Sequence, residues 1–233
     1  MKFRLLCFGS HLLISLVIAL FVVCLVFWLW YPSPLDKALG VANVFLLLLC
    51  IDVIVGPLLT LIVAKQWKKT LKIDLLTIGV IQLAALIYGL YIVAQGRPVW
   101  IIYDSARFEV VQAYEAVIDP ASASSDAFRL GFLGPIWGGV SDVVPDFVGK
   151  DDTYYQAEYL KTYDETIAAK VGANALSLEI LKRFNDPTVL EPILSLYPDA
   201  DAYVPLVAKQ KALSVLINKN SGHSIAIVEL SPW

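Results

Sequence analysis

The first 95 residues of the chain alternate between long apolar segments and short polar connections. The apolar segments lie at about 12–31, 41–64 and 74–95. A helix rises about 1.5 Å per residue, so a segment of this length crosses a hydrocarbon layer of roughly 30 Å. The pattern therefore predicts three transmembrane helices within a membrane region over residues 1–96.

A cleaved signal peptide is the competing interpretation of the first segment, because Lys2 and Arg4 precede it. The segment is longer than the apolar core of a typical signal peptide, and it ends in FWLWY at 27–31 instead of a small-residue cleavage site. Aromatic side chains are typical of the membrane–water boundary. We therefore predict an uncleaved span that ends before Pro32 and Pro34, since proline disfavours helix in the residue before it.

Basic residues predict the direction of the spans. Four of them lie in or beside the connection between the second and third segments: Lys65, Lys68, Lys69 and Lys72. Such clusters mark the side of a span that is not translocated. Together with the basic start of the chain, they predict a bacterial inner-membrane protein with a cytoplasmic N-terminus and a periplasmic region at 97–233.

Beyond residue 97 the apolar residues occur in short, β-branched runs. Two runs, at 99–103 and 108–111, flank polar residues and predict a hairpin. Three further runs, at 203–207, 212–217 and 224–230, predict an antiparallel meander around Asn and Gly turn residues. The predicted fold class is a membrane protein with a periplasmic α+β domain, containing an antiparallel sheet of about five strands and two or three helices.

The middle of this domain has weaker patterns. Helices are predicted at 152–169 and at 174–184, where Asn174 can cap the second helix, with one more turn at 188–194. The stretch 119–150 is rich in Pro, Gly, Ser and Ala, and we interpret it as a long loop lying on the domain core. The alternative is a partner-binding flap, because loops of this length are often functional.

Composition and charge agree with a membrane region followed by an acidic domain. Hydrophobic residues make up 58% of the chain, against about 45–50% in soluble proteins. Seven basic and three acidic residues up to Gly96 give a net charge of +4, whereas eleven basic and eighteen acidic residues after it give −7. The acidic second half argues against nucleic-acid binding. The cysteines are at 7, 24 and 50, so the domain has no disulfide or cysteine-based zinc site.

Asp52 is the only ionisable residue of the second apolar segment and lies near its middle. An aspartate there costs about 2.5–3.5 kcal/mol on insertion scales, so such residues usually face protein. Pro57 is expected to kink the helix beside it, and Gly56 and Gly79 leave room for a neighbouring helix. Gln82 lies about one helical turn from the depth of Asp52, close enough for the two side chains to meet.

Three interpretations of this polar position remain open. In the first, a hydrogen bond from Gln82 to a protonated Asp52 joins the second and third spans. In the second, Asp52, Gly56, Pro57 and Gln82 form a contact site for the transmembrane helix of a partner. The third is a proton relay, which is disfavoured because one acid without a chain of titratable groups conducts nothing.

The sequence offers little for catalysis. It has two histidines, His11 beside the first span and His223 in a predicted turn, and it lacks GxSxG and HExxH motifs. The glycine-rich stretch 131–139 lacks the strand–helix context of a phosphate loop. Acidic pairs at 151–152 and 164–165 are interpreted as solvated positions, because neighbouring residues of a helix point apart. We predict no catalytic, cofactor-binding or metal-binding residues, no cofactor and no enzymatic activity.

Several motifs follow one another along the chain. They are IDVIVGPLLTLIV at 51–63, KKTLKIDL at 68–75, QLAAL at 82–86, YGLY at 88–91, RPV at 97–99 leading to RF at 107–108, VPL at 204–206, and ELSPW at 229–233. In this order they resemble the TfpX/TfpZ family of type IV pilin accessory proteins. The resemblance covers 31–111 and 203–233, whereas 115–202 departs from the family pattern.

The resemblance implies an inner-membrane accessory protein that acts as a dedicated chaperone for its cognate major type IV pilin. Its partners would be membrane lipid and the pilin, through both the transmembrane helix and the globular head of the pilin. Two other classes remain as alternatives. One is a membrane-anchored periplasmic ligand sensor or envelope scaffold, and the other is a membrane-bound hydrolase that uses outer carboxylates.

Overall fold

The computed structural model describes residues 1–119, 128–142, 144 and 150–233, and the chain folds into two compact units. The helical unit comprises Met1–Leu29 and Gly40–Gly96. The sheet unit comprises Trp30–Leu39 and Arg97–Trp233. The short segment between the first two predicted spans therefore packs with the C-terminal part of the chain.

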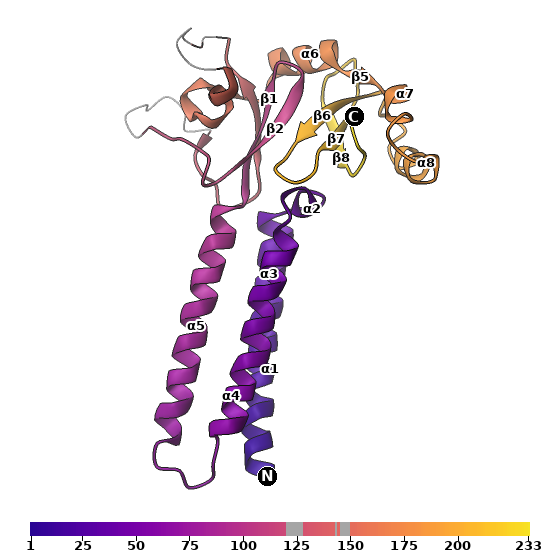
Figure 1. The fold of residues 1–233 in the computed structure, drawn as a ribbon. Coiled ribbons are helices and arrows are strands. Elements are labelled where there is room, and N and C mark those ends of the chain that lie inside the picture. The colour runs from indigo at the N-terminus through magenta and orange to yellow at the C-terminus, as the bar shows by residue number, and fades with distance from the viewer. Residues whose placement is uncertain (120–127, 143, 145–149) are drawn as a thin grey trace. The chain divides into compact units, whose positions relative to one another are not determined.

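Within the described residues, the helical unit has three helices that are long and apolar enough to cross a membrane. They are Lys2–Trp30, Val41–Val63 and Leu71–Gln95 (Figure 1). The three predicted helices are thus present, but the first begins at Lys2 instead of residue 12 and the third at Leu71 instead of residue 74. Hydropathy marks where apolar residues begin, whereas a helix extends for as long as its backbone hydrogen bonds form.

Two of these helices contain wider, π-helical segments. The elements are α1 (Lys2–Cys24), η1 (Leu25–Trp30), α3 (Val41–Cys50), η2 (Ile51–Val55), α4 (Gly56–Val63) and α5 (Leu71–Gln95). The segment η2 ends just before Gly56 and Pro57, where the proline ring would crowd the carbonyl of Val53 in a regular helix. The wider turn lets the helix pass through the proline position without a break.

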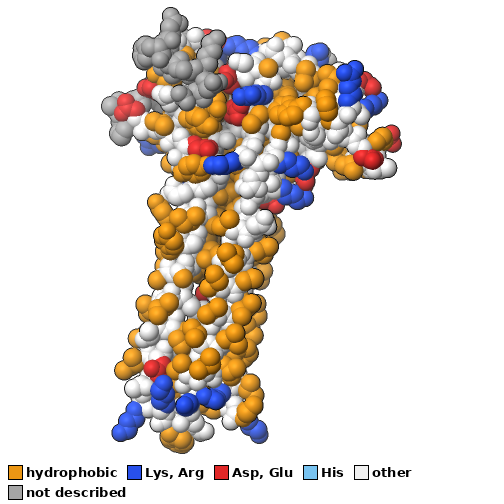
Figure 2. All heavy atoms as spheres, in the orientation of Figure 1, with side chains coloured by type: hydrophobic (Ala, Val, Ile, Leu, Met, Phe, Trp, Pro, Cys, Tyr) orange, Lys and Arg blue, Asp and Glu red, His pale blue; other side chains and the backbone are white. Residues whose placement is uncertain are grey.

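The lysine and arginine residues of the helical unit gather at one end of the bundle (Figure 2). The Arg4 side chain donates hydrogen bonds to the carbonyls of Ile62 and Ala64, both 2.9 Å away, so the start of α1 lies beside the end of α4. Along the helices, at most 22% of the most apolar window of each helix is buried inside the structure. Such an exposed apolar surface is typical of helices that lie in lipid.

The sheet unit contains, within the described residues, an eight-stranded mixed sheet that curls (Figure 1). Its strands are β1 (Pro98–Asp104), β2 (Arg107–Gln112), β3 (Ile136–Val140), β4 (Leu160–Thr162), β5 (Leu176–Ser177), β6 (Ala202–Val207), β7 (Leu213–Ile217) and β8 (Ser224–Val228). The spatial order is β4-β3-β1-β2-β6-β7-β8, and β5 pairs with β6.

The prediction of an antiparallel sheet of about five strands was wrong in both number and direction. The β1–β2 hairpin and the β6–β7–β8 meander are present as predicted. However, β1 pairs in parallel with β3, and β2 pairs in parallel with β6. Parallel pairs join segments that are distant in sequence, so no local turn pattern announces them.

The strand β3 lies in the stretch 119–150, so the prediction of one continuous loop there was wrong. A Cβ on Gly138 would lie 2.4 Å from the Phe128 ring and 2.6 Å from the Lys161 carbonyl, and one on Gly139 would lie 2.8 Å from Ile167. Glycine is needed here because neighbouring groups pack against the strand, and this contact leaves no strand-like pattern in the sequence. Residues 120–127, 143 and 145–149 of this stretch lie outside the described residues, and the alternative of a partner-binding flap stays a prediction.

The helices of the sheet unit differ from the predicted ones. Those described are α2 (Leu35–Leu39), η4 (Lys150–Tyr155), η5 (Ala157–Tyr159), α6 (Glu165–Asn174), α7 (Leu178–Leu181) and α8 (Pro187–Ser195). The predicted helix at 152–169 was mostly wrong, because β4 pairs with β3 and α6 begins only after Asp164, which accepts the N–H of Ile167 at 2.9 Å. The turn predicted at 188–194 is part of α8, which Asp186 caps.

The prediction of a helix over 174–184 was also wrong for most of its length. The side chain of Asn174 does not cap a helix there; it donates to the Tyr103 hydroxyl at 3.2 Å and to the Lys170 carbonyl at 3.0 Å. The next two residues form β5, and Ser177 caps the short helix α7. Pairing with β6 thus overrides the helical spacing of the apolar residues.

Candidate functional site

A polar pair lies in the middle of the helical unit. Gln82 on α5 donates from Nε2 to the backbone carbonyl of Asp52 at 2.8 Å and to its Oδ1 at 3.1 Å. The Asp52 residue is 8% exposed. The two side chains meet, as their depths predict, and the hydrogen bond joins the second and third helices. The Oε1 of Gln82 is buried and has no hydrogen-bond partner within the described residues.

Proline chemistry explains why Gln82 reaches the backbone as well as the carboxyl group. In the i→i+5 pattern of the π-helical segment, the carbonyl of Asp52 would accept from the N–H at position 57. Pro57 has no N–H, and an unsatisfied carbonyl within an apolar bundle is costly. The amide of Gln82 donates to that carbonyl instead. The proline and the glutamine thus act together on one helix position.

Gly56 makes room for this contact. A Cβ at Gly56 would lie 1.9 Å from Nε2 of Gln82, and both Gly56 and Pro57 are buried within the bundle. By contrast, a Cβ at Gly79 meets nothing within 4 Å. The structure therefore uses Gly56, Pro57 and Gln82 to pack the helices together. Their proposed contact with a partner helix stays a prediction.

Two apolar grooves flank the polar pair. One, of about 240 Å³, lies between α1 and α5 and has Asp52 at its base. It is lined by His11, Ile14, Ser15, Ile18, Asp52, Gly79, Gln82, Leu83 and Leu86. The other, of about 140 Å³, lies between α5 and the second helix. It is lined by Leu48, Ile51, Asp52, Val55, Leu59, Ile78, Ile81, Gln82, Ala85 and Leu86. Asp52 and Gln82 thus line both grooves.

A second polar contact joins α1 to α4, and sequence reasoning did not identify it. The Nδ1 of His11 lies 2.6 Å from the Thr60 hydroxyl, and Thr60 is buried. Ser15, one helical turn further along α1, is also buried. The spacing of His11 and Ser15 at i and i+4 places both on one helix face, and this was the signal available in the sequence.

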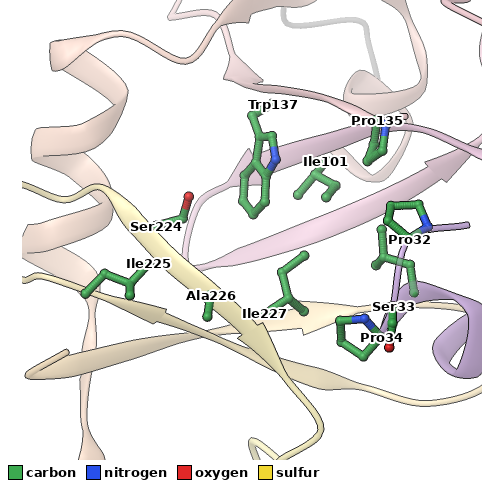
Figure 3. A pocket seen from close by; sticks show the side chains of 11 residues that line it. Pro32, Ser33, Pro34, Ile101, Pro135, Trp137, Ser224, Ile225, Ala226 and Ile227 are labelled. Carbon is green, nitrogen blue, oxygen red and sulfur yellow. The ribbon is translucent and has the colours of Figure 1, made fainter. Parts of the chain in front are cut away.

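The sheet unit has a separate pocket of about 330 Å³ (Figure 3). Its lining comes from four separate parts of the chain. The lining residues are Pro32, Ser33, Pro34, Leu35, Ile101, Pro135, Trp137, Ser224, Ile225, Ala226 and Ile227. Strand β8 forms one wall and stands at the end of the sheet. The pocket is apolar and uncharged, which suits an apolar side chain or an extended segment.

Ionic contacts hold the short helix α2 close to this pocket. The Lys37 ammonium contacts the Glu229 carboxylate, and Lys211 lies 3.6 Å from the same carboxylate. The Lys37 contact holds the pKa of Glu229 below its ordinary value of 4.5. Backbone N–H groups of Gln210 and Lys211 donate to the Ala38 carbonyl. The segment 30–39 is therefore an integral wall of the sheet unit.

The other polar residues weighed for catalysis lie apart. His223 contacts the carbonyl of Ser221 in its own turn, and Asp164 caps α6. The side chains of Asp151 and Asp152 lie outside the described part of the structure. The residues described include no group of three or more His, Cys, Asp or Glu side chains that could hold a metal ion.

Comparison with known proteins places this chain among fimbrial proteins. Residues 1–40 match the family described as "Fimbrial assembly protein FimB". The "Fimbrial assembly protein, serogroup I" of Dichelobacter nodosus is 37% identical over 123 residues, which cover 52% of this chain and 48% of the relative. The serogroup E1 protein is 36% identical over 123 residues, again 48% of its length. The match thus spans about half the length of these two relatives.

A third relative is covered almost completely. The "Fimbrial assembly protein, serogroups C1 and C2" of Dichelobacter nodosus is 36% identical over 113 residues, which cover 48% of this chain and 86% of the relative. No solved structure matches the chain.

Proposed function

The chain belongs to the fimbrial assembly protein family, and from this premise we propose that it is an inner-membrane accessory protein of the TfpX/TfpZ kind. In this role it binds its cognate major type IV pilin, stabilises it in the membrane and supports pilus assembly. The names of the relatives support the assembly role. The resemblance of the motifs at 51–63 and 82–86 to pilin accessory proteins, together with the grooves around them, supports the chaperone role.

The observation that carries the proposal is the Asp52–Gln82 pair between two apolar grooves. A lipid-facing bundle has no need of a polar group at mid-depth, and such groups usually serve packing or function. Here the pair packs the helices and also faces the groove between α1 and α5. A partner helix in this groove would meet the small residues Ser15 and Gly79, which permit close approach. The transmembrane helix of a pilin is the proposed occupant.

The orientation of the chain determines which parts of a pilin it meets. We propose that the lysine-rich end of the bundle faces the cytoplasm and that the sheet unit lies in the periplasm. The basic residues at the N-terminus and in the α4–α5 connection support this orientation. The uncharged pocket beside β8 then offers a surface to the globular head of the pilin.

Co-purification of pilin from native membranes after crosslinking tests the proposal. Asp52→Leu and Gly56→Ala should each lower the pilin recovered per molecule of the accessory protein. Gly9→Ala is the matched control for Gly56→Ala, because a methyl group at Gly9 meets nothing within 4 Å and Gly9 lines neither groove. Immunoblots of the accessory protein correct for loss of the protein itself. Unchanged pilin recovery and normal piliation with Asp52→Leu would refute the membrane contact.

A ligand sensor or envelope scaffold is the rival proposal, and the pocket of about 330 Å³ is the observation that favours it. The crosslinking experiment separates the two. Pilin as the main crosslinked product supports the chaperone, whereas a heterogeneous set of products without pilin supports the sensor or scaffold. We propose no enzymatic activity for the chain.

A further inference from the structure

A short loop of the sheet unit presents large apolar side chains to solvent. Between Phe128 and β3, the side chains of Leu130, Phe132 and Leu133 are 42%, 60% and 65% exposed. Phe128 itself is buried against Trp100, with ring centroids 5.9 Å apart. The loop is therefore attached to the core at its base and apolar at its apex, and we name residues 129–134 the apolar loop.

Local geometry holds the apolar loop in this exposed conformation. The N–H of Gly131 donates to the Arg129 carbonyl at 2.8 Å, which closes a tight turn. Gly134 has a φ of +49°, a conformation that glycine adopts easily, and Pro135 follows it. The apex is thus shaped by its own backbone and does not fold back to bury its apolar side chains.

Two contacts tie the apolar loop to the points where the chain leaves the helical unit. The ring of Phe132 packs edge-on against Trp30, 5.7 Å between centroids, and Trp30 is the last residue of the first long apolar helix. The Arg97 guanidinium donates to the Gly131 carbonyl at 3.2 Å, and Arg97 directly follows the C-cap of α5. Trp30 and Arg97 thus lie at the ends of two helices that are proposed to cross the membrane.

From these contacts we propose that the apolar loop inserts into the outer interfacial layer of the lipid bilayer. Apolar and aromatic side chains at the headgroup boundary are stabilised there. The loop contacts Trp30, which ends the first long helix, and Arg97, which follows the third, so the chain itself keeps the loop within a few residues of the proposed spans. The inference rests on the membrane crossing proposed above but does not depend on pilin binding.

Lipid quenching in nanodiscs tests the inference with the full chain and no pilin. Cys7, Cys24 and Cys50 are first replaced by Ala, and single cysteines are then introduced as Leu133→Cys, Leu130→Cys, Leu196→Cys and Leu47→Cys. Each variant carries a polarity-sensitive fluorophore, and its emission is compared with and without brominated lipid. Leu196 is 73% exposed in the same unit and serves as the water control, whereas Leu47 is 64% exposed on α3 and serves as the span control.

We expect the labels at Leu133 and Leu130 to be quenched several-fold more than the label at Leu196. If Leu133 and Leu130 match Leu196 while Leu47 is quenched, the loop lies in water and the inference falls while the membrane crossing stands. If the label at Leu47 is also not quenched, the results contradict both the insertion of the loop and the membrane crossing. In a separate sample, purified pilin is added. If the emission of the label at Leu133 reports an apolar environment only in that sample, the loop contacts protein and the lipid assignment is overturned.

Discussion

The helical unit and the sheet unit differ in how much of their apolar surface they bury. In the helical unit the buried contacts include the polar pairs Asp52–Gln82 and His11–Thr60, whereas most apolar side chains face outward. In the sheet unit, Trp100, Tyr203 and many aliphatic side chains are buried. The hydrophobic effect stabilises the sheet unit in water, but it does not drive helices together in lipid, because lipid tails are as apolar as the side chains. Helix association there depends on close packing and on hydrogen bonds.

This difference indicates where each unit can recognise a partner. In an apolar solvent, an apolar groove alone gives little specificity, so a polar group within it provides the selective contact. In water, an uncharged concave surface such as the pocket beside β8 is already attractive to an apolar segment. Under the proposed function, the two units would contact two chemically different parts of a pilin through two different kinds of site.

The largest expected contrast is between one leucine substitution in each unit. Leu216→Ala removes a fully buried side chain from the sheet unit and should cost about 2–5 kcal/mol of stability. Leu47→Ala removes a side chain that faces the proposed lipid and should cost far less. Hydrogen exchange of the β7 and α3 amides in detergent measures both changes. Equal losses would show that the two units are stabilised in the same way.

A glycine pair gives the next largest contrast, within the sheet unit. Gly138→Ala places a methyl group against the Phe128 ring and the Lys161 carbonyl, and overpacking of this kind costs about 1–3 kcal/mol. Gly131→Ala meets its nearest neighbour at 3.8 Å, an ordinary contact. Thermal unfolding of the two variants should therefore differ. A Gly138→Ala variant as stable as Gly131→Ala would contradict the packing of β3.

The Asp52–Gln82 hydrogen bond should contribute less than either core contact. A double-mutant cycle with Asp52→Leu and Gln82→Leu should give a coupling energy of about 0.6 kcal/mol, the average for hydrogen bonds between membrane helices, and no more than about 1.7 kcal/mol. Unfolding of the purified protein in mixed micelles provides the four stabilities. A coupling energy of zero would mean that the two side chains do not interact, and the polar pair would then lose its role in packing.

The smallest expected effect concerns pH and the link between α2 and the sheet. Lys37 lowers the pKa of Glu229 below its ordinary value of 4.5. The carboxylate therefore stabilises the folded state above pH 4.5, and this contribution is lost as the pH falls through the lowered pKa. The thermal midpoint of the natural protein should fall more between pH 7 and pH 3 than that of Glu229→Gln. Identical pH profiles would show that the ion pair contributes nothing to stability.

The elements that sequence reasoning predicted are those with a local cause. The length of the apolar segments predicts the three long helices. The β1–β2 hairpin closes around a short turn between Asp104 and Arg107. The meeting of Asp52 and Gln82 also followed from their depths. The parallel β1–β3 and β2–β6 pairs, by contrast, have no local signature.

Where the prediction failed, a distant contact decides the conformation. Asn174 binds Tyr103 instead of capping a helix, and Leu176 joins β6. Gly138 lies in β3, where it pairs with Ile102 and Thr162 and leaves room for the Phe128 ring. The pocket in the sheet unit could not be predicted either, since its walls at 32–35, 101, 135–137 and 224–227 meet only after folding.

Photocrosslinking from α5 in native membranes tests the central claim most directly. A photoreactive amino acid replaces Leu83, which lines the groove between α1 and α5, or Val80, which lines neither groove. The two residues are almost equally exposed, at 55% and 57%. We predict a pilin adduct from Leu83 and little or none from Val80. Equal adducts from both positions, or pilin at neither, would contradict a pilin-binding groove beside Asp52.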